Sequence, residues 1–443
     1  MAPGTALHEE VREATPARRS VWLWWRITGT WFPPLVALLS GWTLLAWRSG
    51  KHGEGLFLPS TWARYDSGHY LAIARNGYIA EACKKGQLSP KLPPVHYYLC
   101  GNGGWFPGYP DAIRAVSRLV GVSTPIAALI VTWVCWYLVL FLMWRLLADA
   151  GSRPSRWVCL LIAAFFPGQV YFAALFPISL CIAGLLSCLY AVLRGSRLAL
   201  AGVAFVSGFV AAYSYITAMA VVPALLVTAF LAMRGRHRLR ALISALGIVA
   251  GFGAVLLTMR QTTGFWNAYF LTTQKYGVGV HSPLATLKDR LSPLWTSQPA
   301  RLQYQSYTAS QTLLALCFVL LAVVVTLGWA AWRPPPRPPA EPAAEVEHDT
   351  PPARPLSWST RWSRALTSRL SAFDLTFLLA AVGVWLVPYI ASGQASTYRS
   401  EAFVILTVPL LRRLPSWLLI IPLAASVFVA WHMAAYFFNG RLT

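Results

Sequence analysis

Long apolar runs separated by short arginine-rich segments dominate the pattern along this 443-residue chain. An α-helix needs about 17–25 mostly apolar residues to cross a membrane, and the runs have about that length. The sequence therefore predicts an all-α polytopic membrane protein with about eleven transmembrane helices. The expected spans are residues 32–48, 124–146, 157–175, 178–193, 198–215, 218–233, 241–258, 312–332, 373–391, 402–411 and 415–436. The 402–411 run is short and carries Pro409, so a broken or half-length helix is the alternative there.

Composition excludes a soluble protein. Hydrophobic residues make up 56% of the chain and charged residues only 12%, too few to cover the surface of a soluble domain of this size. The net charge of +22 would suit a nucleic-acid-binding protein. However, the arginines fall in short loops between apolar runs, where they set topology. We therefore expect the basic residues to interact with the lipid bilayer and not with nucleic acid.

The arginine clusters also predict orientation. If the N-terminal segment 1–30 is cytosolic, every cluster falls on the cytosolic side, as short basic loops usually do. The clusters are Arg18, Arg19 and Arg26; Arg145, Arg153 and Arg156; Arg194 and Arg197; Arg234, Arg236, Arg238 and Arg240; and Arg412 and Arg413. We expect a multi-pass protein of the cell membrane whose first span is not cleaved as a signal peptide.

This topology divides the chain. An N-terminal transmembrane module, 31–332, carries two long extracytosolic loops, 49–123 and 259–311, with short amphipathic helices. A proline-rich cytosolic linker, 333–372, has too little apolar content to form a core. A smaller transmembrane module, 373–443, follows it.

The first outward loop holds a candidate site. Asp66, His69 and Tyr70 share one helix face at spacings of three and four residues, and Arg64 precedes them. A carboxylate, an imidazole and a phenol on one face are equipped for proton transfer. The simpler alternative is that Asp66 only caps the helix and pairs with Arg64.

Two further features of the outward loops suggest a site or a fold constraint. Residues 111–120 predict an amphipathic helix whose Arg114 and Arg118 either attract lipid phosphates or extend to the headgroups. Cys83 and Cys100 are the two cysteines of the outward loops, which favours a disulfide on an oxidising face. No CxxC or histidine-rich spacing accompanies them, so we expect no metal and no cofactor.

Three motifs carry a family resemblance. Residues 64–70, 74–78 and 105–110, reading RYDSGHY, ARNGY and WFPGYP, resemble the PIG-V-type mannosyltransferases in order and spacing. The likeness extends more weakly to 264–284 and to 396–399. The resemblance implies a GT-C-like bundle that transfers a sugar, with inversion, from a polyprenyl-phosphate donor to an acceptor hydroxyl of an unknown glycan, lipid or protein. It implies Asp66 as the catalytic base.

Within this reading, the remaining site residues have expected roles. His69 and Tyr70 would orient Asp66 or the sugar. The cations expected at the donor phosphate are Arg64, Lys275 and Arg399. The residues expected around the sugar or acceptor are Asn76, Tyr78, Trp105 and Tyr109.

Two stretches depart from the family pattern. An acidic element of the family corresponds here to 175–179, which has no acid, and an arginine position corresponds to 212–216, which has no base. These departures leave the acceptor and sugar open. They also keep two alternatives: a transporter or flippase for a lipid-linked substrate, and a catalytically silent homologue that acts as a scaffold subunit. No convincing internal repeat supports the transporter.

Overall fold

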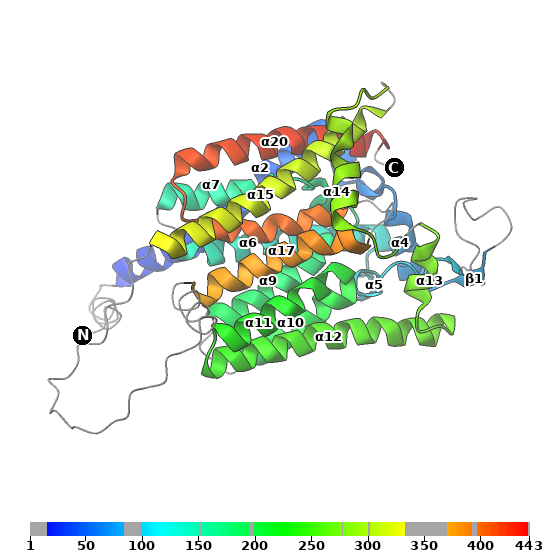
Figure 1. The fold of residues 1–443 in the computed structure, drawn as a ribbon, viewed down its shortest axis with the longest axis horizontal. Coiled ribbons are helices and arrows are strands. Elements are labelled where there is room, and N and C mark those ends of the chain that lie inside the picture. Colours follow the sequence, from blue (N-terminus) through cyan, green and yellow to red (C-terminus); the bar gives the residue numbers. More distant parts are fainter. Residues whose placement is uncertain are drawn as a thin grey trace.

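The computed structural model describes residues 16–83, 99–149, 152–194, 199–276, 278–299, 302–332, 370–391 and 397–441. Nearly all of the expected linker lies outside these ranges. The described chain is almost entirely helical, and its long helices lie side by side in one bundle (Figure 1). Shorter elements gather at one end of this bundle, around helix α4 (Ser67–Asn76), which we call the α4 end.

Within the described ranges, six helices are long and apolar enough to cross a membrane. They are α2 (Pro16–Ser49), α6 (Thr124–Leu146), α12 (Gly235–Thr263), α15 (Tyr304–Trp332), α17 (Ala372–Ala391) and α20 (Ser416–Phe438). This finding supports the expected multi-pass helical membrane protein. Shorter apolar elements fill the bundle between them: α9 (Ile178–Arg194), α10 (Leu200–Ser214), η3 (Ile216–Ala220), α11 (Val221–Leu231), η6 (Glu401–Thr407) and α19 (Val408–Leu411). The expected count of about eleven spans is not established by these lengths.

The expected span 157–175 is interrupted. Helix α7 (Arg153–Ala164) ends before Pro167 and Gly168, and the short α8 (Val170–Ala173) follows. Proline disfavours a helical conformation at the residue before it, and Gly168 adopts φ +86°, which suits glycine best. The prediction of one continuous helix was wrong because a Pro-Gly turn lies inside an otherwise apolar run.

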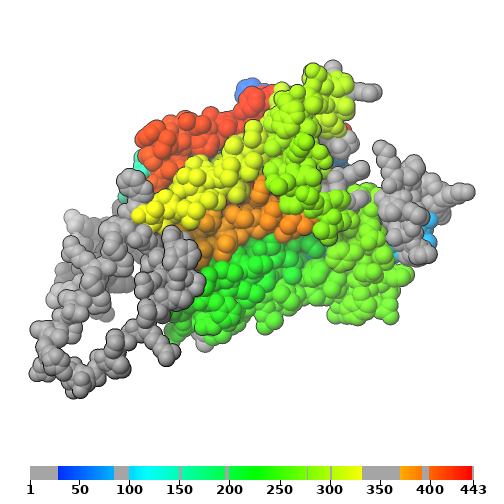
Figure 2. Space-filling model, in the orientation of Figure 1, coloured from blue at the N-terminus to red at the C-terminus, as the bar shows by residue number. Residues whose placement is uncertain are grey.

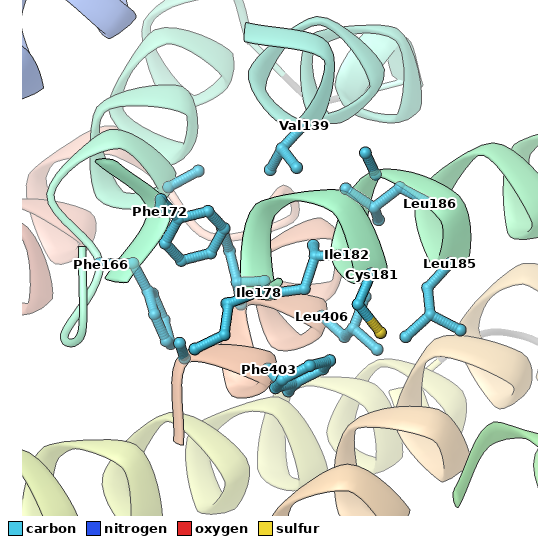
Figure 3. Packing of buried hydrophobic residues seen from close by; sticks show 14 of the residues in the cluster. Val139, Phe166, Phe172, Ile178, Cys181, Ile182, Leu185, Leu186, Phe403 and Leu406 are labelled. Atoms are coloured by element: carbon cyan, nitrogen blue, oxygen red, sulfur yellow. The ribbon is translucent and has the colours of Figure 1, made fainter. Parts of the chain in front are cut away.

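The 402–411 run forms a broken helix, the alternative raised by its proline. It consists of the 3₁₀ helix η6 followed by α19, and all of its side chains are buried. Phe403 and Leu406 of η6 pack against Ile182 and Leu185 of α9 in the centre of the bundle (Figure 3). Helices from both sides of the linker therefore share one hydrophobic core.

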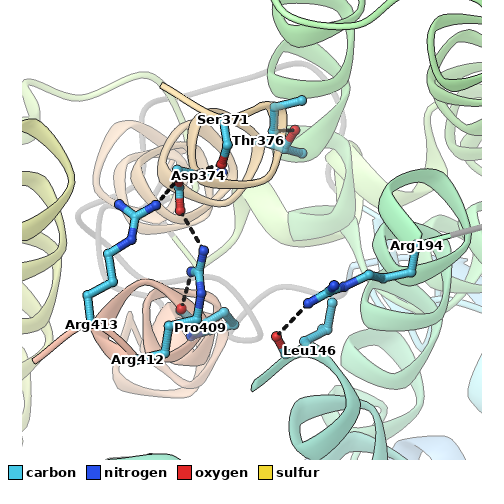
Figure 4. A network of polar contacts seen from close by, with 9 residues as sticks. Leu146, Arg194, Ser371, Asp374, Thr376, Pro409, Arg412 and Arg413 are labelled. Carbon is cyan, nitrogen blue, oxygen red and sulfur yellow. Dashed lines mark hydrogen bonds and ion pairs between the residues drawn. The ribbon is translucent and has the colours of Figure 1, made fainter. Parts of the chain in front are cut away.

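A buried ionic network closes the bundle at the end opposite α4. Asp374, in the first turn of α17, is 1% exposed and accepts hydrogen bonds from Arg412 at 2.9 Å, from Arg413 and from Ser371 (Figure 4). The Arg412 guanidinium also lies 4.2 Å from the centre of the Phe373 ring. The network fastens the end of α19 to the start of α17.

The α4 end is built from short elements of the expected outward loops. They are η1 (Gly53–Phe57), α3 (Pro59–Trp62), α4, β1 (Ala80–Ala82), β2 (Leu99–Gly101), α5 (Gly108–Val120), α13 (Ala268–Gln274), α14 (Pro283–Leu291) and η4 (Ser292–Leu294). Helix α18 (Thr397–Ser400), which follows the linker, joins them. The space-filling view shows α14 crossing the ends of the long helices (Figure 2).

A disulfide and a small sheet join two parts of the first loop. Strands β1 and β2 pair antiparallel with Glu81 opposite Cys100, a small sheet that the sequence did not predict. The expected pair, Cys83 and Cys100, is bonded, with a Cα–Cα distance of 4.9 Å. The two ends of the segment between them are thereby held together.

Candidate functional site

A pocket of about 120 Å³ lies at the α4 end of the bundle. Its walls come from segments that are far apart in the sequence. The lining residues are Asp66, Tyr70, Gly104, Trp105, Phe106, Phe176, Ile178, Tyr215, Ile216, Tyr269 and Arg399. Two of these, Asp66 and Arg399, are charged, so the pocket presents one carboxylate and one guanidinium within aromatic and aliphatic walls.

Asp66 and Arg399 form an ion pair in which Nη1 of Arg399 donates to Oδ2 of Asp66. Their side chains are 34% and 13% exposed, respectively, so the carboxylate stays accessible from the pocket. Asp66 occupies the residue before α4, yet its side chain caps no helical N–H group. The alternative of a capping Asp66 paired with Arg64 was therefore wrong, because its carboxylate is turned toward Arg399.

The backbone before α4 explains this direction. Tyr65 adopts φ +53°, an uncommon conformation for a residue other than glycine. The Ser67 hydroxyl accepts a hydrogen bond from the Arg64 N–H at 3.2 Å, which closes the turn. Ser67 thus satisfies a backbone donor at the start of the helix, and the Asp66 side chain remains available to the pocket.

Aromatic rings hold the guanidinium of Arg399. Its central carbon lies 5.2 Å from the ring centre of Phe176 and 5.8 Å from that of Tyr65. Cations are attracted to ring faces at such distances. The arginine is therefore placed by both a carboxylate and ring faces, which gives it a defined position at the pocket.

The other two residues of the predicted α4 face lie differently. Tyr70 lines the pocket, and its burial raises its pKa well above the usual value, so the phenol stays neutral and can act only through hydrogen bonding. His69 stacks on Trp105, with ring centres 3.7 Å apart and planes at 18°, and is not a lining residue. Burial lowers the pKa of His69; the nearby Asp66 raises it in part, and Lys275 lowers it slightly further.

Of the four residues expected around a sugar, Trp105 lines the pocket and the other three lie outside it. Tyr109 is fully buried, and its hydroxyl lies 2.6 Å from that of Thr132. The Tyr78 hydroxyl donates to the Trp105 carbonyl at 2.8 Å, so Tyr78 supports the wall. Asn76 is exposed at the end of α4.

The three expected phosphate-binding cations are not brought together. Arg399 lines the pocket, whereas Arg64 and Lys275 do not. Lys275 lies beside the disulfide, with Nζ 3.9 Å from Sγ of Cys100, and its pKa is lowered by burial. The three cations come from three separate segments of the chain, and the packing of α13 against β2 places Lys275 beside the disulfide instead of in the pocket.

Helix α5 uses its first arginine within the protein. Arg114 donates to the carbonyls of Ile73 at 3.0 Å and Ala74 at 3.2 Å, and to Asp111 at 3.0 Å. These carbonyls belong to the last turns of α4, where a cation is favourable. Arg114 therefore fixes α4 against α5 through hydrogen bonds within the protein, whereas Arg118 is exposed.

Sequence reasoning missed most of the pocket wall. Phe176 and Ile178 fall within 175–179, and Tyr215 and Ile216 fall within 212–216. These two stretches lie apart from the three motifs described above, and both reach the pocket. The sequence carried a local signal for the first stretch, where Pro177 separates two apolar runs; the end of α10 at Ser214 became known only from the structure.

Comparison of the chain with protein-family models and with curated proteins finds no match. Within the described ranges, no three His, Cys, Asp or Glu side chains gather into a possible metal site.

Proposed function

We propose that this chain is an integral-membrane glycosyltransferase of the PIG-V type. Its pocket would bind a polyprenyl-phosphate sugar donor and the hydroxyl group of an acceptor. The observation that carries the proposal is the meeting of Asp66 with Arg399 at an aromatic-walled pocket. A base and an anion-binding group are the two charged groups that this transfer needs. The proposal includes a GT-C-like bundle of about eleven spans, with the pocket on the extracytosolic side of the cell membrane.

The proposed reaction is a single displacement. The acceptor hydroxyl gives its proton to the Asp66 carboxylate while its oxygen attacks the anomeric carbon of the sugar. The bond between that carbon and the phosphate oxygen breaks on the opposite face, and the polyprenyl phosphate leaves with the electron pair. The new glycosidic bond therefore has inverted configuration, and the proton remains on Asp66 until it passes to solvent.

Arg399 has two roles in the proposed reaction. Its guanidinium stabilises the phosphate as negative charge develops during bond cleavage. A phosphate that binds Arg399 also competes with Asp66 for the N–H groups of the guanidinium. Binding of the lipid-phosphate sugar would therefore free the Asp66 carboxylate to accept a proton. The ion pair is then the resting arrangement of a site that becomes active when the donor arrives.

The aromatic wall suits a sugar. Trp105 and Tyr269 line the pocket, and ring faces of this kind pack against the C–H groups of a pyranose. His69 stacks on the Trp105 ring, and the Tyr78 hydroxyl donates to the Trp105 backbone carbonyl, so both the ring and the main chain of Trp105 are held in place. The polyprenyl tail would lie among apolar helices, where each buried methylene contributes about 0.8 kcal/mol.

The decisive experiment uses Asp66→Asn in membranes supplied with a labelled polyprenyl-phosphate sugar. We expect transfer to fall by about 10²–10⁴-fold, the usual contribution of a general base. Asp111→Asn is the matched control because Asp111 also pairs with an arginine at this end of the bundle but does not line the pocket. Transfer by Asp66→Asn at the wild-type rate would refute the assignment of Asp66 as the catalytic base. Product analysis by mass spectrometry separates sugar transfer from movement of an unchanged lipid.

A further inference from the structure

Glu401 is a buried carboxylate that the proposed reaction does not use. It is 2% exposed and does not line the pocket. Three side chains donate to it: Gln311 Nε2 at 2.9 Å, Thr312 Oγ1 at 2.6 Å and the Tyr389 hydroxyl at 2.8 Å. Burying a carboxylate among apolar helices is costly unless hydrogen bonds compensate for its lost hydration, so this arrangement requires a specific set of donors.

The donors come from two helices that flank the segment carrying Arg399. Gln311 and Thr312 belong to α15, and Tyr389 lies near the end of α17. All three are at most 2% exposed. One carboxylate therefore joins the start of η6 to α15 and α17 together.

Glu401 is also placed to determine the position of Arg399. Arg399 lies on α18, a four-residue helix that leads directly into η6 at Glu401. Runs of 3₁₀ helix longer than three or four residues are uncommon, because their hydrogen bonds are poorly aligned, and η6 has seven residues. Such a segment has little intrinsic preference for its own position, so a side-chain anchor at its first residue fixes where the preceding turn lies.

We propose that Glu401 is a positioning residue that holds the backbone of α18 so that the Arg399 guanidinium meets Asp66. It acts through Arg399 and touches neither donor nor acceptor. The catalytic consequence rests on the proposed glycosyltransferase function, whereas the placement of α18 does not.

The first experiment measures placement without requiring activity. Asp66→Cys and Arg399→Cys are combined with Cys317→Ser, which removes an exposed free thiol, in the full-length protein. A short bifunctional thiol reagent then links positions 66 and 399, and the yield is measured by mass spectrometry of the linked peptides. Glu401→Gln should lower this yield several-fold, and an unchanged yield overturns the proposal.

Asp374→Asn is the matched control for this measurement. It converts another buried carboxylate to an amide, at 1% exposure, at the far end of α17. Measured well below its unfolding temperature, it should leave the 66–399 yield unchanged. Equal loss of yield in both variants would show a general effect of loosening the bundle and would overturn a specific role for Glu401.

The second experiment uses equilibrium binding of polyprenyl phosphate as the probe. Glu401→Gln should weaken binding by about tenfold, and should add nothing in an Arg399→Ala background, because both changes remove the same interaction. Tyr389→Phe, which removes one donor and leaves Gln311 and Thr312, should act in the same direction with a smaller effect. It also keeps the test available if Glu401→Gln does not fold.

The outcomes separate the two proposals. Additive losses in the double variant would show that Glu401 acts independently of Arg399. A wild-type protein that transfers no sugar would refute the proposed function, while the cross-linking yield would still decide whether Glu401 places α18.

Discussion

Arg399 donates to Asp66 across a separation of 333 positions in the sequence. Asp66 immediately precedes α4 in the first expected outward loop, and Arg399 lies on α18 beyond the linker. Two short helices from opposite parts of the chain thus contribute one charge each to the same pocket. The chemistry proposed for this protein depends on that meeting, so it can be tested from either side.

Replacing Arg399 should weaken stabilisation of the leaving phosphate more than it lowers the stability of the fold. Arg399→Ala should lower the transfer rate by about 10²–10³-fold, as loss of a transition-state donor does in other enzymes. Arg399→Lys should retain part of the rate, because it keeps the charge but loses the planar fork of donors. Transfer kinetics with varied donor concentration check this. Arg118→Ala, an exposed arginine on α5, is the control and should behave as wild type.

The stack of His69 on Trp105 predicts a loss of stability in acid. Burial lowers the pKa of His69 below 6.5, so the neutral ring is favoured in the folded protein. Its contribution is therefore fully present above the unfolded pKa, and it is lost as the pH falls through the lower, folded pKa. Thermal unfolding across this range should show the decline, which His69→Phe should reduce while keeping an aromatic ring on Trp105.

His52→Phe is the control for this pH effect because His52 is exposed. It should leave the acid decline as in the wild type. If His69→Phe declines with pH as steeply as the wild type, another group is responsible.

Removing the disulfide should destabilise the α4 end. Cys83 and Cys100 are 17 positions apart, and a bridge across about that length contributes roughly 3 kcal/mol in the chain-entropy description. A double change to serine should therefore lower the unfolding temperature, and reduction of the wild type should give the same shift. Cys317→Ser, at an exposed free thiol, should give no shift. Equal stability of the oxidised and reduced wild type would contradict the prediction.

The far end of the bundle offers a test of buried against exposed charge. Asp374→Asn removes the carboxylate that Arg412 and Arg413 share, and breaking a buried ion pair costs about 3–5 kcal/mol. Asp111→Asn removes the partner of Arg114 in a pair whose side chains are 34% and 42% exposed, where about 0–1 kcal/mol is usual. Unfolding measurements on both variants should rank them in this order, and the reverse order would contradict the burial argument.

The sequence by itself determined the helical membrane character, the short loop elements near Asp66 and the two cysteines that are bonded. These features follow from local properties: the length of an apolar run, the spacing of residues on one helix face and the count of cysteines in outward loops. The same local reasoning could weigh Arg64 as the partner of Asp66, because Arg64 is two positions away.

Only the tertiary structure decided that Arg399 is the partner, since no spacing rule relates positions 333 apart. It also decided that Phe176 and Tyr215 form pocket walls and that Tyr109 lies behind them. A helix turn specifies which side chains share a face, whereas the packing of η6 against α9 and of α4 against α5 and α6 specifies which faces meet. The sequence was therefore enough to single out Asp66. Its partner, Arg399, was determined by the packing of segments that are far apart in the chain.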